Sequence, residues 1–248
     1  MNPEEITIAE SQTSLGQLLS ELLGKGATPP NPWRDRLEVA DRRIAYRALV
    51  EKLGWRYARC EFANYDIYEP EQPQGLKRPS QLEAYNRVRQ FAEEMPERLA
   101  EGGGLVLFGR PGTGKDHLLV ACMFWAILRH GWRVNWVDGS NLYQEARDMI
   151  GTKERESDMI AKYTTPPILA ISDPIPPKGD TTPYATDVVQ RIVDRRYREM
   201  KSTWATLNVH DGAEAEGRLA SPIIDRLRHN SLCLECNWQS HRERKDAT

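Results

Sequence analysis

The sequence has little of several features that would mark a specialised class of protein. Only four of its 248 residues are cysteine, too few for a disulfide-dense secreted scaffold. Its 34 basic and 36 acidic side chains nearly cancel, so no overall basic field indicates nucleic-acid binding. It contains no apolar run of membrane-spanning length and no signal peptide after Met1. The composition, 40% hydrophobic and 28% charged, is that of a globular protein, which we expect in the cytoplasm.

Two of the cysteines, Cys233 and Cys236, form a C-x-x-C pair without a second pair of ligands elsewhere in the sequence. The pair lies in an apolar, strand-like run, where residues three apart face opposite sides of a sheet. We therefore expect two structural cysteines in a reducing environment, with no metal or redox role.

One stretch carries a strong chemical signal. Residues 109–116 match the P-loop pattern G-x-x-x-x-G-K-[ST] at every fixed position except the last, between apolar runs at 105–108 and 118–128. These runs predict a buried strand and a buried helix, a context that a chance glycine-rich turn would lack. In a P-loop, backbone N–H groups, the helix N-terminus and the lysine bind nucleotide phosphates. The expected nucleotide-binding residues are Gly109, Arg110, Pro111, Gly112, Thr113, Gly114, Lys115, Asp116 and His117.

Strand-like and helix-like patterns alternate through the rest of this region. A capping box at Ser80 begins a helix ahead of the P-loop. Such alternation is typical of an α/β fold in which helices cover both faces of a parallel sheet, giving three layers. We expect this P-loop ATPase domain over residues 70–248. The further strands are predicted at 133–137, 167–171, 203–209 and 231–237.

A small helical module is predicted over residues 1–69. One helix spans 11–26, and a second runs from Asp35 to near Gly54 after a proline-rich turn. The second helix is expected to bury Leu37, Ala40, Ile44 and Ala48. The first helix carries a leucine stripe that either packs on the main domain or docks on a partner protein. The stripe consists of Leu15, Leu18, Leu19, Leu22 and Leu23.

The expected metal-binding positions depart from the usual pattern twice. P-loop ATPases hold Mg²⁺ with a Ser or Thr after the lysine and with a Walker B Asp at the end of another strand. Here Asp116 follows the lysine, and the strand at 167–171 is followed by Ser172 and Asp173. In one register Asp173 is the metal Asp, and Pro174 takes the place of the catalytic acid. In the other, Ser172 has the metal position and Asp173 is the catalytic acid.

We favour the second register because it explains both unusual residues by a single change, in which the hydroxyl and the carboxylate have been exchanged between the P-loop and the Walker B motif. Asp116 and Ser172 would then face Mg²⁺ from opposite sides, as one carboxylate and one hydroxyl. The alternative is that both positions have decayed and that hydrolysis is slow or lost.

Two residues downstream are also candidates for a role in hydrolysis. Asn208 ends the predicted strand at 203–209, where it either orients the attacking water or simply terminates the strand. Arg226 lies on a short helix at 221–229 whose apolar residues face inward. An outward arginine there is either a solvated charge or a finger that reaches the nucleotide of a neighbouring subunit.

The order and spacing of these motifs resemble the AAA+ group that contains the DnaC/DnaI helicase loaders and the IstB transposition helpers. By position, Asn208 resembles sensor I, Arg226 the arginine finger and Arg242 sensor II. The chain ends just after Arg242, so the resemblance implies an AAA+ core without a C-terminal helical lid. The matching pieces are 109–118, 192–196, 206–208, 223–230 and 237–242.

The resemblance implies an ATPase that uses ATP and Mg²⁺ and self-associates into an open ring or spiral around single-stranded DNA. The N-terminal helices would bind the replicative helicase, which the protein would load. The alternatives are an IstB-like helper of a transposase and a nucleotide-gated scaffold with little hydrolysis. Local positive charge for DNA is available on one predicted helix, although a solvated helix face explains it equally well. These residues are Arg191, Arg195, Arg196 and Arg198.

Overall fold

The computed structural model describes residues 36–69, 71, 74–75, 77–149, 156–175 and 183–242. All of them belong to one compact unit, which begins at Asp35. The leucine stripe predicted between Leu15 and Leu23 lies outside the described residues. Among the helices that are described, none combines the length and the apolar content that crossing a bilayer requires.

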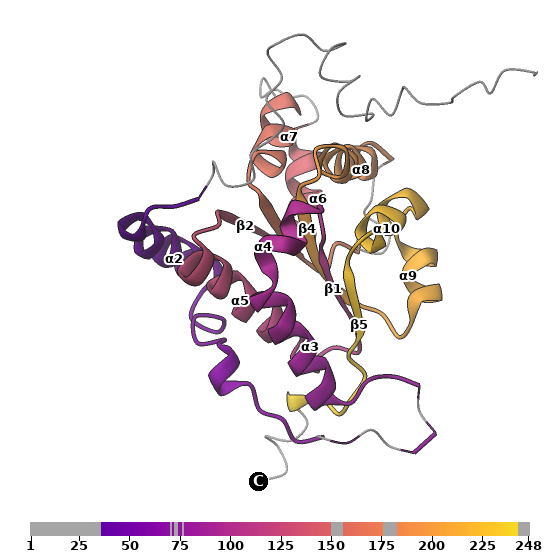
Figure 1. Ribbon diagram of the computed structural model, residues 1–248. Helices are drawn as coiled ribbons and strands as arrows, with labels where there is room; N and C mark the ends of the chain where they lie inside the picture. The colour runs from indigo at the N-terminus through magenta and orange to yellow at the C-terminus, as the bar shows by residue number, and fades with distance from the viewer. Residues whose placement is uncertain are drawn as a thin grey trace, which may run out of the picture. The chain divides into compact units, whose positions relative to one another are not determined.

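The centre of the unit is a sheet of five parallel strands in the order β2-β3-β4-β1-β5 (Figure 1). Each predicted strand is present, with its ends shifted by a residue or two, which confirms the expected parallel α/β fold. The strands are β1 (Leu105–Gly109), β2 (Val134–Asp138), β3 (Ile168–Ser172), β4 (Ser202–Asn208) and β5 (Leu232–Glu235).

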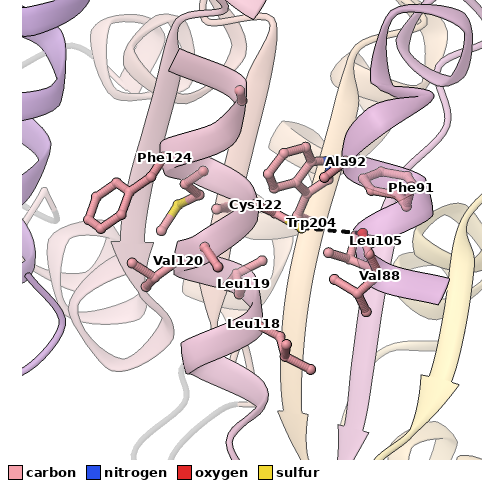
Figure 2. Close-up of a cluster of buried hydrophobic side chains, with 14 of the residues drawn as sticks. Val88, Phe91, Ala92, Leu105, Leu118, Leu119, Val120, Cys122, Phe124 and Trp204 are labelled. Carbon is pink, nitrogen blue, oxygen red and sulfur yellow. Dashed lines mark hydrogen bonds between the residues drawn. The ribbon is translucent and has the colours of Figure 1, made fainter. Parts of the chain in front are cut away.

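Both faces of the sheet are buried because successive strand residues point to opposite sides and helices cover each side. Leu105 and Leu107 belong to one hydrophobic cluster, whereas Val106 between them belongs to the other. Figure 2 shows the first cluster, where α3 and α5 bring their apolar faces against Leu105 and Trp204. Cys233 and Cys236 likewise contact opposite clusters, so the two thiols face away from each other.

Two groups of helices make the outer layers (Figure 1). The first face carries α2 (Val39–Leu53), the short turn η1 (Phe62–Asn64), α3 (Gln81–Glu93), α4 (Met95–Ala100), α5 (Lys115–Trp125) and the π-helical turn η2 (Ala126–His130). The second face carries α6 (Gly139–Asp148), α7 (Glu156–Thr164), α8 (Pro183–Arg198), α9 (Gly212–Arg218) and α10 (Ser221–Arg228).

The segment 36–69, which the sequence places with the N-terminal module, packs on the ATPase domain. Leu49, Phe62 and Tyr65 are buried in the same cluster as the P-loop helix α5. The prediction of which side of α2 is buried is wrong. Ile44, which was expected to be buried, is 67% exposed, whereas Leu49 is 5% exposed. Both sides of this helix carry apolar residues, so periodicity alone does not decide which side is buried.

The helix ahead of the P-loop begins as predicted. The Ser80 hydroxyl accepts a hydrogen bond from the Glu83 backbone N–H at 3.0 Å and caps α3. In the first turn of α3 the apolar Leu82 is exposed, whereas the polar Gln81 is fully buried. The Gln81 amide fixes the preceding segment, since it accepts from Tyr68 N and Glu69 N and donates to Asp66 O.

The basic cluster predicted on α8 is not a continuous charged surface. Arg196 is completely buried, and burial lowers its pKa to about 9. Arg191 is ion-paired with Glu156, and Arg195 with Glu199 at 2.8 Å. The Arg196 guanidinium donates to backbone carbonyls and a hydroxyl that hold the ends of neighbouring segments together. Its acceptors are Tyr163 O, Pro166 O, Pro167 O, Ser202 O and Thr203 Oγ1. The expectation that Arg196 offers charge to DNA is therefore wrong.

Arg196 is instead expected to be a major contributor to stability. Arg196→Met keeps an unbranched chain but leaves several buried acceptors without donors, which should lower the free energy of unfolding by about 3 kcal/mol. Arg195→Met removes the same charge from an exposed, screened ion pair and should cost less than about 1 kcal/mol. Urea unfolding of both variants measures the difference. Equal destabilisation would contradict a structural role specific to Arg196.

Candidate nucleotide-binding site

The P-loop lies at the carboxyl end of the sheet, where an open cavity of about 710 Å³ is found. β1 ends at Gly109 beside Asn208 at the end of β4, so the phosphate loop and the predicted sensor residue adjoin. The cavity is lined by Lys115, Asp116, His117, Asn208 and Arg242, all predicted from the sequence. The opposite wall comes from the irregular segment between α2 and α3, which supplies Arg56, Tyr57, Arg59, Cys60, Asn64 and Asp66.

Lys115 is 4% exposed and closes the loop on itself. Its ammonium donates to the backbone oxygens of Gly109 at 2.8 Å and Arg110 at 2.6 Å. Burial lowers the pKa of Lys115 below its ordinary value. A phosphate group bound here would favour the charged form of Lys115, because an adjacent anion stabilises a buried ammonium. This fits the role expected for the P-loop lysine.

The side chains of Asp116 and Ser172 are in direct contact. The Ser172 hydroxyl donates to Asp116 Oδ1 at 3.0 Å. A second hydroxyl, that of Thr206, donates to the same oxygen at 2.7 Å. β3 and β4 pair with Ser172 opposite Thr206, which places both hydroxyls side by side under the carboxylate. Thr206 as a contact of Asp116 was not predicted, because its partner is known only once the strand order is known.

This cluster fits Mg²⁺ by its chemistry. The ion prefers oxygen ligands and is usually held by one or two carboxylates together with substrate phosphates and water. Asp116 offers one carboxylate, and Ser172 and Thr206 offer neutral oxygens. When bound with nucleotide, the ion would neutralise charge on the phosphates. Among the described residues no cluster of three or more histidine, cysteine or acidic side chains suggests a metal site of another kind.

Asp173 follows β3 and is fixed against the predicted sensor residue. Its backbone is in the left-handed region, with φ of 52°. Its carboxylate accepts from the Asn208 backbone N–H at 3.1 Å and from the Asn208 amide at 2.8 Å. Asp173 therefore faces β4, and Asp116 keeps its two hydroxyl partners. The assignment of Mg²⁺ to Asp116 and Ser172, with Asp173 as the catalytic acid, stays a prediction, and the hydrogen bond between Asp116 and Ser172 is the observation that supports it.

The remaining predicted residues divide between two places. His117 packs edge-on against Tyr65, and its Nε2 lies 2.8 Å from Glu61 O. Burial lowers the pKa of His117. Arg226 lies elsewhere, in an ion pair with Asp194 at 2.5 Å, and it lines a separate cavity of about 240 Å³ with Tyr197. Arg226 thus faces a surface other than the nucleotide cavity of its own chain.

The segment 55–66 is the part of the site that motif reasoning missed. Its signal was an aromatic-rich, irregular stretch without a periodic pattern, which does not reveal contacts with a distant loop. Tyr65 shows what the stretch does, because its hydroxyl lies 3.4 Å from Thr113 O in the P-loop. The chain before α3 therefore forms part of the nucleotide cavity.

The five-stranded parallel sheet, the P-loop and the polar residues at adjoining strand ends define a P-loop ATPase of the AAA+ type. The chain belongs to the family of IstB-like ATP binding proteins, whose model matches residues 99–248.

Comparison with individual proteins separates two groups of relatives. The chain is 30% identical over 213 residues to the replicative helicase loader DnaC of Buchnera aphidicola subsp. Schizaphis graminum, covering 85% of this chain and 79% of that protein. It is 31% identical over 150 residues to a putative insertion sequence ATP-binding protein of Sinorhizobium fredii, covering 59% and 49%. The crystal structure of the DnaC helicase loader superposes with a TM-score of 0.61 and 22% identity, covering 74% of this chain and 99% of that one. This structural likeness supports the fold.

Proposed function

We propose that the protein is an ATP-dependent helicase loader of DNA replication. The carrying observation is the extent of its similarity to the DnaC loader. That similarity covers 213 residues, more than the stretch 99–248 contains, so it continues into the chain ahead of the family domain. In this protein, residues within 56–66 line the nucleotide cavity, and the segment 36–69 packs in the same hydrophobic cluster as α5.

The proposed catalytic roles belong to residues that line the cavity and to Ser172 and Asp173, which are hydrogen-bonded to the lining residues Asp116 and Asn208. Lys115 and the P-loop N–H groups bind the phosphates, and Asp116 and Ser172 hold Mg²⁺. Asp173, oriented by Asn208, positions the attacking water, and Arg242 contacts the phosphates from the cavity wall. The partners of this activity are the replicative helicase, bound through the N-terminal residues, and single-stranded DNA.

A reconstituted loading assay tests the proposal. The protein, the replicative helicase of the same cell and ATP are incubated with single-stranded DNA coated by its binding protein. We expect helicase on the DNA only when the protein and ATP are both present, and ATP turnover that single-stranded DNA changes several-fold. Helicase loading that is independent of the protein would overturn the proposal.

An IstB-like helper of a transposase is the second candidate, supported by the family model and the Sinorhizobium relative. That relative matches only the shorter stretch of 150 residues, which is why we prefer the loader. Turnover that responds to duplex DNA but not to single-stranded DNA, without helicase binding, would favour the helper.

Arg226 is proposed to act on the nucleotide of a neighbouring subunit, in an ATP-dependent ring or spiral. Arg226 lines the smaller cavity and pairs with Asp194, so it lies outside the lining of the nucleotide cavity in its own chain. Arg226→Ala is therefore expected to keep ATP affinity within about threefold while reducing turnover on the order of 1000-fold, the range for arginine fingers.

Mixing variants separates action across an interface from action within a chain. Lys115→Ala protein has an intact Arg226, and Arg226→Ala protein has an intact P-loop. Together they should recover part of the turnover that each lacks alone. Arg228→Ala, on the same helix and paired with Glu216 in an exposed ion pair, is the control and should retain turnover. Full activity of a monomeric Arg226→Ala protein would refute the finger.

A further inference from the structure

The outside of the P-loop is bonded to the segment that follows β5. The His241 backbone N–H donates to Gly112 O at 2.9 Å, and the Trp238 indole N–H donates to Thr113 O at 2.7 Å. On the same side, the Asn237 side-chain oxygen accepts from the Arg110 N–H at 2.8 Å. Three residues of the phosphate loop, Arg110, Gly112 and Thr113, are thus bonded to one short stretch of chain, residues 236–242.

These contacts control where the loop aims its N–H groups. A peptide unit is planar and trans, so fixing a carbonyl on one side fixes the next residue's N–H on the other. The bond to Gly112 O therefore aims the Thr113 N–H, and the bond to Thr113 O aims the Gly114 N–H. Both would turn toward the cavity side, where a phosphate accepts them. A glycine-rich loop lacking such bonds has freedom to rotate these peptides.

The P-loop also packs closely against the segment that follows β5. A Cβ added at Gly109 would collide with the Cys236 carbonyl, and one added at Gly112 would collide with the Ser240 hydroxyl. The segment behind the loop therefore requires glycine at position 109, where the clash is with backbone, whereas at Gly112 the clashing Ser240 hydroxyl belongs to a side chain that can rotate. Trp238 is 2% exposed, so its bond to the loop is shielded from water.

We propose that residues 236–242 form a clamp that holds the P-loop in its phosphate-binding conformation, with Trp238 as a positioning residue. The inference rests on ATP binding by this loop, as in the proposed function. It adds that the same segment carries Arg242 into the cavity, so nucleotide binding and order in the clamp support each other.

Two buried tryptophans make a matched pair of variants. Trp238→Phe removes the N–H that reaches Thr113 O while keeping an aromatic ring. Trp204→Phe removes an equally buried indole N–H, which donates at 2.8 Å to the Ser202 hydroxyl inside the sheet. Affinity for a fluorescent, non-hydrolysable ATP analogue is measured with the full chain, together with its melting temperature.

We expect about fivefold weaker analogue binding by Trp238→Phe, the value of one lost hydrogen bond, and unchanged binding by Trp204→Phe. Hydrogen exchange should show analogue-induced protection at residues 237–242 in the wild type and less in Trp238→Phe. If Trp238→Phe is too unstable to assay, Tyr65→Phe removes the other donor to Thr113 O and should weaken binding by about twofold.

The outcomes separate the clamp from the proposed function. If the wild type fails to bind the analogue, ATP binding itself is refuted. If the wild type binds and Trp238→Phe binds equally well, the clamp is refuted alone. An equal loss of affinity in both tryptophan variants, in step with their melting temperatures, would also refute it, because stability would then explain the effect.

Discussion

Lys115→Ala is expected to weaken ATP binding on the order of 100-fold, the largest loss of ATP affinity that we expect from a single substitution in this chain. The ammonium is the buried cation of the P-loop, and a hydrogen bond to a charged group contributes about 1.5–3 kcal/mol. It also ties Gly109 O and Arg110 O together, so its removal costs both the phosphate contact and part of the loop's shape. Isothermal titration of wild type and variant with Mg²⁺-ATP measures the loss.

Lys162→Ala is the control for the change in charge. Lys162 lies on α7, is half exposed, pairs with Glu145 at 2.8 Å and is not among the residues that line the cavity. It should bind ATP as the wild type does. A Lys115→Ala protein that melts like the wild type and binds ATP with undiminished affinity would refute the P-loop assignment itself.

Much of this architecture is readable from local patterns. A parallel strand covered on both faces is a short apolar run, which is why all five strands were predicted and Leu105–Gly109 was correctly placed before the P-loop. The phosphate-binding residues of the P-loop are adjacent in the sequence, so the motif can be recognised without knowledge of the tertiary structure. The alternation of the two patterns then determines the fold class.

The parts that were missed depend on partners distant in sequence. Arg196 was expected to be a surface charge because the local sequence does not show what it bonds to. Most of its acceptors are carbonyls of residues 163–167, about 30 positions earlier, and one is Ser202 O. Thr206 gained its role from a strand order that no local pattern gives. The wall of the cavity at 55–66 has no periodicity to detect. Such contacts become visible only with the tertiary structure.

The exchange between Asp116 and Ser172 makes a second large prediction, which concerns the metal. Because Asp116 places a carboxylate at the phosphates, ATP binding without Mg²⁺ should suffer repulsion between like charges. Wild-type affinity for ATP is therefore expected to fall at least about tenfold in EDTA. A titration with Mg²⁺ at a fixed concentration of a fluorescent ATP analogue measures how analogue binding depends on the metal, and it does not require turnover.

Two substitutions, alone and combined, test the exchange as a double-mutant cycle. Asp116→Thr removes the carboxylate from the pair and should weaken Mg²⁺-dependent binding by about tenfold, because only neutral oxygens remain. Ser172→Asp alone adds a second carboxylate at a position whose present hydroxyl lies 3.0 Å from Asp116 Oδ1, and it should destabilise the metal-free protein by repulsion. Asp116→Thr with Ser172→Asp restores the common arrangement of hydroxyl and carboxylate.

The double variant should recover Mg²⁺-dependent binding to within about threefold of the wild type, although Asp116→Thr alone is impaired. Recovery of this kind requires the two positions to serve one ion, since independent sites would give additive losses. Thr206 remains in place in every variant and offers the same hydroxyl to whichever carboxylate is present. Asp116→Thr with Thr164→Asp, which adds the carboxylate at another buried threonine, is the control and should show no recovery. A double variant that binds no better than Asp116→Thr alone would mean that Asp116 and Ser172 do not share a metal ion, and that the altered motifs have lost the site.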